Sequence, residues 1–219
     1  MLFVPAHNQA QLNETDWPDW SNDVCAVIAG GASVARVDVA SLRGRCKVAV
    51  VNNSHMLAPW ADALYAADEF WWENAIGLEN FSGLKFAPAK VDAKRYGLKS
   101  VDLIAETDTD MDKFSMERKG LIARGGNSAF QLVNLVTQFG AKKQIWIGFD
   151  FVGDHWHSRH KPPLRNPRPQ TLQKWAERFD KQKPLLDALG VSVINASDVS
   201  ALQAYPKATL CHALKTWLL

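Results

Sequence analysis

The sequence has few cysteines, and they are not arranged as a recognisable pair. Cys25, Cys46 and Cys211 are odd in number, far apart in the chain and never spaced as CxxC. This arrangement excludes a cysteine-based zinc site and a disulfide framework, and it favours a reducing compartment. We therefore expect a cytoplasmic protein.

Long apolar runs and a signal-peptide pattern are also missing. No run approaches the roughly 18–20 apolar residues that a membrane span needs. The first residues, MLFVPAHNQAQLNETDW, have no basic n-region and only a short apolar stretch. No internal repeat or low-complexity segment is present. The 219 residues, 47% of them hydrophobic, suit one globular domain over residues 24–219, preceded by an N-terminal arm of residues 1–23.

What the sequence does have is an uneven distribution of charge. The window from Ser158 to Lys183 carries a net charge of +6, whereas the whole chain carries +2. A local basic patch favours a phosphate-bearing partner, either a nucleotide or a nucleic acid. The alternative is the solvated face of an amphipathic helix. The basic residues of this window are Arg159, Lys161, Arg165, Arg168, Lys174, Arg178, Lys181 and Lys183.

Short β-rich apolar runs alternate with helical patterns along the chain. This alternation predicts an α/β fold, Rossmann-like, with a mainly parallel sheet and helices on both faces. Within it, we expect Ser33 to cap a short helix and Pro184 to kink or split a longer one. The expected strands cover residues 24–29, 47–51, 62–66, 84–88, 101–105, 143–150 and 191–195, and the expected helices cover residues 33–42, 70–78, 128–139, 171–189 and 209–219.

The loops that follow the strands are polar and rich in glycine, and ligands of parallel sheets bind beyond the carboxyl ends of the strands. Two of them, AGGAS and ARGGNSAF, feed helix N-termini, where backbone amides can bind an anion. The alternative for each is a tight turn that needs glycine only for its backbone conformation. The nucleotide-binding residues that we predict from these loops are Gly30, Gly31, Ser33, Asn52, Asn53, Asp68, Gly125, Gly126, Asn127, Ser128, Arg159 and Lys161.

The segment FDFVGDHWHSRH contains three of the six histidines of the chain, His155, His157 and His160. Together with Asp150 and Asp154 they could bind a transition metal, but no spacing matches a known ligand pair, so we assign no metal residues. A single histidine that acts as a general base or acid and is oriented by a carboxylate requires a less specific geometry than a metal site. A polar loop without a catalytic role is the remaining alternative.

Two further polar patterns have simpler interpretations. The segment ETDTDMDK contains a DxD pair, Asp108 and Asp110, of the kind that holds a divalent ion in many glycosyltransferases, but a solvated acidic loop is the favoured interpretation. Gln131, Asn134 and Gln138 share one face of the expected helix over residues 128–139. We expect that face to be solvated.

Several segments together resemble a known group of proteins. VIAGGAS, VAVVNNS, APWADALYAADEFWW, GGNSAFQLVNLVTQFGAKKQIWIGFDF and GVSVINAS look like a phage and prophage protein family of unassigned function. More distantly, they are similar to the sialyltransferases of glycosyltransferase family 42 and to the 6-hydroxymethylpterin diphosphokinase domain. The match spans roughly residues 24–200.

The resemblance to family 42 implies specific roles for some of the predicted residues. The family pattern has a glycine-rich turn after the first strand, which corresponds to Gly30, Gly31 and Ser33. Its asparagine after the second strand corresponds to Asn52 or Asn53, and its Ser/Gly turn before the long helix corresponds to Gly126 and Ser128. The Gly-x-Asp-Phe element corresponds to residues 148–151, and the base lies in the stretch that holds the three histidines. The chain departs from the pattern in having Gly-Ala-Ser-Val for Gly-Pro-Ser-Leu, a shorter spacing to the histidines and no clear equivalent of the tyrosines that assist the leaving phosphate.

The sequence thus predicts a group transferase that binds a nucleotide or nucleotide-sugar donor and is encoded by a phage or prophage, which would place it in the host cytoplasm. His155, His157 or His160 would be the base, Asp150 would orient either the base or the donor, and Arg159 or Lys161 would offset phosphate charge. One alternative is a pyrophosphokinase-like enzyme that uses Mg²⁺ with ATP. The other is a non-enzymatic phage accessory protein that binds nucleic acid through the basic window. A homo-oligomer is compatible with each of these interpretations.

Overall fold

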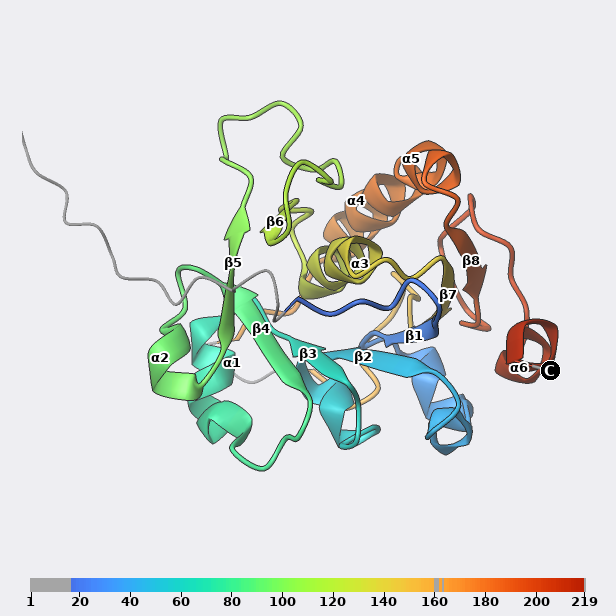
Figure 1. Cartoon of the computed structure of the whole chain (residues 1–219), viewed down its shortest axis with the longest axis horizontal. Helices are drawn as coiled ribbons and strands as arrows, with labels where there is room; N and C mark the ends of the chain where they lie inside the picture. Colours follow the sequence, from blue (N-terminus) through green and yellow to red (C-terminus); the bar gives the residue numbers. More distant parts are fainter. Residues whose placement is uncertain (1–16, 160–161, 163, 219) are drawn as a thin grey trace, which may run out of the picture.

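A computed structural model describes residues 17–159, 162 and 164–218 of the chain. The described part contains one parallel sheet of eight strands in the order β6-β5-β4-β3-β2-β1-β7-β8 (Figure 1). This confirms the α/β, Rossmann-like prediction, and every strand pair is parallel. The strands are β1 (Val24–Ile28), β2 (Lys47–Val51), β3 (Ala63–Tyr65), β4 (Leu84–Pro88), β5 (Lys99–Leu103), β6 (Leu121–Ile122), β7 (Lys143–Ile147) and β8 (Ser192–Asn195).

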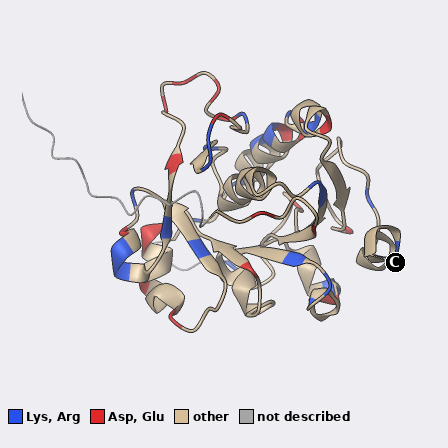
Figure 2. Ribbon diagram, viewed as in Figure 1, with Lys and Arg blue, Asp and Glu red and all other residues tan. Residues whose placement is uncertain are grey.

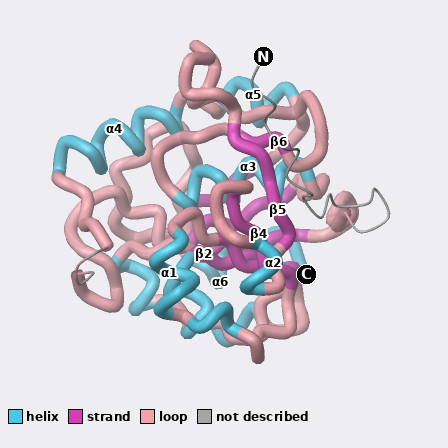
Figure 3. The backbone as a smooth tube through the Cα atoms, turned by 90° about the vertical axis from the view of Figure 1, so that its left-hand side faces the viewer, coloured by secondary structure: helices cyan, strands magenta, loops and turns pink. Residues whose placement is uncertain are grey.

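Helices cover both faces of the sheet. Figures 1 and 3 show α3, α4 and α5 on one face and α1, α2 and α6 on the other. The α-helices are α1 (Glu69–Asn74), α2 (Ala93–Tyr96), α3 (Ser128–Gln138), α4 (Pro169–Asp180), α5 (Lys183–Ala188) and α6 (Leu210–Leu218). Short 3-10 helices lie between these elements: η2 (Ala32–Arg36) and η3 (Val39–Leu42) after β1, η4 (Asn52–Met56) after β2 and η5 (Ile76–Leu78) after α1. None of the helices in the described residues is long and apolar enough to cross a membrane.

The two faces of the sheet form two apolar cores, as the alternation of side chains along a strand requires. All five residues of β1 are buried; Cys25 and Val27 pack in the core under α3, whereas Ala26 and Ile28 pack in the opposite core. A strand covered on both faces is a continuous apolar run, which is why β1, β2 and β7 are easily found in the sequence.

Residues 17–23 lie against the α3 side of the sheet. The rings of Trp17 and Trp20 contact Phe139 at centroid distances of 5.1 and 4.8 Å, and Trp20 is buried. The backbone amide of Trp20 also donates to the Phe139 carbonyl at 2.7 Å. This part of the predicted arm therefore packs on the core, and residues 1–16 lie outside the described residues.

Some predicted element boundaries were wrong. The helix expected over residues 70–78 is broken, because α1 ends at Asn74 and Ile76, Gly77 and Leu78 have φ between 48° and 63°. The ammonium group of Lys85 donates to the Gly77 carbonyl at 2.8 Å and stabilises this left-handed turn. The helix expected over residues 33–42 is two 3-10 helices, and Ser33 does not cap either of them. The strand predicted at residues 101–105 corresponds to β5, which begins and ends two residues earlier than predicted.

The polar stripe on α3 is not solvated, which corrects the prediction for it. Asn134 is fully buried; its amide oxygen accepts from Ser115 and Ala123 at 3.0 and 2.9 Å, and its amide nitrogen donates to the Ser115 carbonyl at 2.9 Å. Gln138 and Gln131 bind the same stretch of chain, through the Leu121 and Arg124 carbonyls among others. These side chains fix residues 115–124 along α3, and so they position the turn that leads to Asn127.

Candidate functional site

The candidate site lies where the direction of the strand order reverses. β1 pairs with β2 on one side and with β7 on the other, and Ile28 is level with Ile147 in the register. The loops after β1 and β7 therefore leave the sheet side by side and connect in opposite directions, which opens the crevice that ligands of such sheets occupy.

The Gly30–Gly31 turn and the histidine segment are in direct contact. The amide of Gly31 donates to the Gly148 carbonyl at 2.9 Å, and the amide of Trp156 donates to the Gly30 carbonyl at 3.1 Å. Nδ1 of His155 lies 3.2 Å from the same Gly30 oxygen. Because a carbonyl oxygen can only accept, this contact is a hydrogen bond when Nδ1 carries the proton, and the lone pair of the ring is then on Nε2.

Asp150 holds the two loops together from beneath. Its carboxylate accepts from the Ser33 amide at 2.8 Å and from the Ser33 hydroxyl at 2.5 Å, and the residue is only 3% exposed. No described hydrogen bond joins Asp150 to a histidine. The structure thus corrects two expectations: Asp150 orients Ser33 and neither of the described histidines, His155 and His157, and Ser33 serves as a buried clamp and not as a helix cap.

Burial raises the pKa of the Asp150 carboxyl, and the hydrogen bonds from Ser33 offset part of that rise. The folded state therefore binds this proton more tightly than the unfolded chain, whose pKa is about 3.9. The stability that this proton contributes is fully present below the unfolded pKa and is lost as the pH rises through the higher folded pKa.

We expect the Asp150→Asn variant to lack this loss of stability. Asparagine can accept from the Ser33 amide and donate to the Ser33 hydroxyl oxygen, so the clamp is kept while the charge is removed. Urea unfolding from pH 3.5 to 7 should show the variant gaining stability relative to the wild type as the pH rises, with the difference levelling off above the folded pKa. A difference independent of pH would contradict the prediction.

His155 and His157 lie together at this edge of the site. Their rings are stacked at a centroid distance of 5.2 Å with an interplanar angle of 6°, and both residues are half-buried. His160 and Lys161 lie outside the described residues. Arg159 is exposed, its guanidinium lies 3.9 Å from the Asp154 carboxylate, and it lines a further cavity beside α4.

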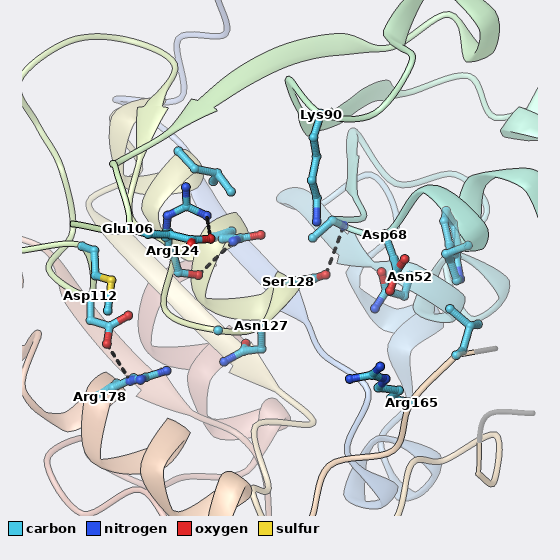
Figure 4. A pocket seen from close by; sticks show the side chains of 17 residues that line it. Asn52, Asp68, Lys90, Glu106, Asp112, Arg124, Asn127, Ser128, Arg165 and Arg178 are labelled. Atoms are coloured by element: carbon cyan, nitrogen blue, oxygen red, sulfur yellow. Dashed lines mark hydrogen bonds and ion pairs between the residues drawn. The ribbon is translucent and has the colours of Figure 1, made fainter. Parts of the chain in front are cut away.

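A cleft with two lobes runs over these loops. The first, here called the histidine lobe, has a volume of about 220 Å³ and is lined by Gly30, Gly31, His155 and His157, with Asp150 below. The second, here called the basic lobe, has a volume of about 650 Å³ (Figure 4). Both lobes are lined by Asn52, Asn127, Ser128 and Arg165, so they are continuous.

The N-terminus of α3 lies at the junction of the lobes. Asn127 caps the helix by accepting from the Phe130 amide at 2.9 Å, and the Ser128 hydroxyl accepts from the Ala67 amide at 3.2 Å, which leaves its own proton to donate. The preceding Gly126 has a φ of 79°, and a Cβ there would lie 2.7 Å from Nη1 of Arg178. The first amides of a helix have no partner inside it and carry a partial positive charge, so this junction favours an anion.

The remaining predicted residues divide into two groups. Asn52 and Asp68 line the cleft, and the buried amide oxygen of Asn52 has no hydrogen-bond partner in the described part of the chain. Asn53 does not line it, because its side chain accepts from the Trp71 indole at 2.7 Å. Gly125 does not line the cleft either, and its carbonyl accepts from the Arg178 guanidinium at 3.1 Å.

All four cations of the basic lobe were missing from the predicted site residues: Lys90, Arg124, Arg165 and Arg178. Arg165 and Arg178 had been noted only as part of the basic window. Lys90 comes two residues after β4, and Arg124 two residues after β6. The rule that ligands bind beyond strand ends would have found Lys90, had it been applied to the loop after the strand expected at residues 84–88, but not Arg124, because β6 was not predicted. Arg178 comes from α4 and is brought to the site by tertiary packing alone.

The acidic loop after β5 does not gather its carboxylates around a metal site. Figure 2 shows acidic residues along this loop. Asp108 and Asp110 are exposed, whereas the Asp112 carboxylate lies 2.9 Å from the Arg178 guanidinium. In residues 17–159, 162 and 164–218, no three His, Cys, Asp or Glu side chains are grouped so as to hold a metal ion.

No protein-family model matches the chain, and no curated protein matches it significantly in sequence.

Proposed function

We propose that the chain binds a nucleotide or nucleotide-sugar donor in the two-lobed cleft and transfers a group from it to a hydroxyl. The observation that carries the proposal is that the twin-glycine turn, the N-terminus of α3 and the histidine segment all line one continuous cleft. A cleft at the reversal point of a parallel sheet, next to a helix N-terminus, suits a phosphorylated ligand. The resemblance to family-42 glycosyltransferases and to a phage family supports the same proposal.

The chemistry proposed for the histidine lobe is general-base catalysis by His155. With its proton held on Nδ1 by the Gly30 carbonyl, Nε2 of the imidazole takes the proton of the acceptor hydroxyl. The acceptor oxygen then forms a bond to the transferred group, the bond from that group to the donor phosphate oxygen breaks, and the electron pair leaves with the nucleoside phosphate. Cations of the basic lobe offset the charge that develops on this phosphate.

Thermal melting with nucleoside monophosphates, nucleoside diphosphates and nucleotide-sugars tests the proposal. A ligand at 100 times its Kd stabilises the folded state by about 2.7 kcal/mol, which corresponds to a Tm increase of about 5–10 °C for a chain of this length. We expect an increase of this size for one base class, in EDTA as well as in Mg²⁺. A shift that requires Mg²⁺ would favour the pyrophosphokinase-like alternative.

The nucleic-acid alternative makes a different prediction for the same protein. Affinity for DNA or RNA would fall steeply with salt and would be unaffected by the His155→Ala change. Absence of any shift across the nucleotide panel, combined with such salt-dependent binding, would overturn the transferase proposal.

A further inference from the structure

Two of the four cations that line the basic lobe are held by the protein itself. Arg124 donates to the Ile104 carbonyl at 2.6 Å and pairs with Glu106 at 3.2 Å. Arg178 pairs with Asp112 at 2.9 Å and donates to the Gly125 carbonyl at 3.1 Å. These contacts brace the loops after β5 and β6 against α4, and the charges of both guanidinium groups are already balanced.

Lys90 and Arg165 are in a different situation. Both are exposed, and within the described residues neither side chain makes a hydrogen bond or an ion pair. Figure 4 shows them extending into the cavity from opposite sides, Lys90 from the loop after β4 and Arg165 from the segment before α4. Ordinary surface cations extend into solvent, whereas these two converge on the space in front of the α3 N-terminus.

That space combines three features that favour phosphate groups. The helix N-terminus offers a partial positive charge, the Ser128 hydroxyl has a proton to donate, and the two unpaired cations lie on opposite sides. Asp68 also lines the lobe and has no ion-pair partner among the described residues. Its carboxylate would repel a bare anion but would accept hydrogen bonds from the hydroxyls of a sugar next to the phosphates.

We propose that the basic lobe is a diphosphate subsite, in which Lys90 and Arg165 hold the two phosphate groups of a nucleoside diphosphate donor. This inference rests on the proposed function and specifies its donor class. Asp68 accepts from a hydroxyl of the adjoining sugar, and the transferred group extends into the histidine lobe past the shared residues Asn127 and Ser128. Two cations on opposite sides of a cavity of about 650 Å³ suit two linked phosphates better than one.

Isothermal titration of the full chain with inorganic pyrophosphate, and with the monophosphate and diphosphate of the base class found above, tests this inference. The wild type should bind the diphosphate at least about tenfold more tightly than the monophosphate, because each charge-assisted hydrogen bond contributes about that factor. Lys90→Met and Arg165→Gln should each weaken binding of diphosphate and pyrophosphate about tenfold or more, and should leave binding of the nucleoside unchanged. Asp68→Asn should strengthen binding of pyrophosphate.

Two charge-matched controls come from the same basic window. Arg168 and Lys174 are exposed and line neither lobe, so Arg168→Gln and Lys174→Met should not change pyrophosphate affinity. If nucleotides bind and the two lobe variants behave like the controls, or if monophosphate and diphosphate bind equally, the diphosphate subsite is wrong while the proposed function stands. If neither nucleotides nor pyrophosphate bind the wild type, both are wrong.

Discussion

A chain with alanine in place of His155 is expected to keep its nucleotide affinity and to transfer the donor group about 10²- to 10⁴-fold more slowly. That range is the usual contribution of a positioned general base. The imidazole lines only the histidine lobe, whereas Lys90 lines the basic lobe and Arg165 lines both. Removing the imidazole leaves both cations in place, so it should affect the reaction and not the binding of phosphates. The measurement is the single-turnover rate of nucleotide release from the nucleotide-sugar that binds, with an acceptor hydroxyl present.

His157→Ala is the matched control for this change. The His157 ring is stacked on that of His155, so its removal should alter the orientation of the base and lower the rate by much less. Melting temperatures of both variants establish that they remain folded. A His155→Ala variant that turns over at the wild-type rate would contradict the assignment of the base, and a large loss only in His157→Ala would transfer the role to that residue.

The elements that could be read from the sequence are those whose signal is local. The helix predicted to begin after Asn127 does so, with the Asn127 side chain as its cap, because the cap and the apolar spacing of α3 both lie within a dozen residues. The strand β7 ends in the apolar run of residues 145–147. By contrast, β6 and α2 have two and four residues, too few to produce a periodic pattern, and neither was predicted.

Polar side chains were misread where their partners are remote in sequence. Asn134 looked like part of a solvated stripe, but it is fully buried because Ser115 and Ala123 supply backbone partners for its amide. Ser33 has the residue type and position of a helix cap, yet Asp150, 117 residues later, accepts both its amide and its hydroxyl protons. A buried polar group needs a partner, and local sequence does not identify a distant one.

The candidate site was found from one topological rule, and it was incomplete for a related reason. The turn at Gly30 and the segment around His155 are 125 residues apart, and they were assigned to one site because loops after parallel strands share an edge. Lys90 was missed because no site residue was predicted from the loop after residues 84–88, and Arg178 because a helix residue can reach that edge only through packing. Sequence thus predicted which loops line the cleft, and its basic window included Arg165 and Arg178, but it did not place these cations in the cleft or identify Lys90 and Arg124.

Replacement of Gly31 by alanine is expected to destabilise the fold by about 3 kcal/mol or more and to abolish nucleotide binding. An added Cβ would lie 2.5 Å from the Gly148 carbonyl oxygen and 2.7 Å from a carboxylate oxygen of Asp150. The carbonyl belongs to the backbone and cannot move aside, so the loops after β1 and β7 must separate. Overpacking of this kind costs about 1–3 kcal/mol, and breaking the buried bonds between Asp150 and Ser33 adds about 1–3 kcal/mol more. Urea unfolding measures the loss, which corresponds to a decrease in Tm of about 6–12 °C.

The Gly30→Ala variant tests whether the destabilisation is specific to Gly31 or follows from any alanine substitution in this turn. A Cβ at Gly30 would meet only the ring of His155, with Nδ1 at 2.9 Å, and a side chain can rotate away where a backbone carbonyl cannot. The Gly30 variant should therefore lose less than about 1 kcal/mol of stability and keep its nucleotide affinity, while transfer slows because the imidazole is displaced. If both variants were equally destabilised, the clamp formed by Asp150 and Ser33 would not be what holds the two loops together. If the Gly31 variant were as stable as the wild type, the close approach of the β1 and β7 loops on which the cleft depends would be wrong.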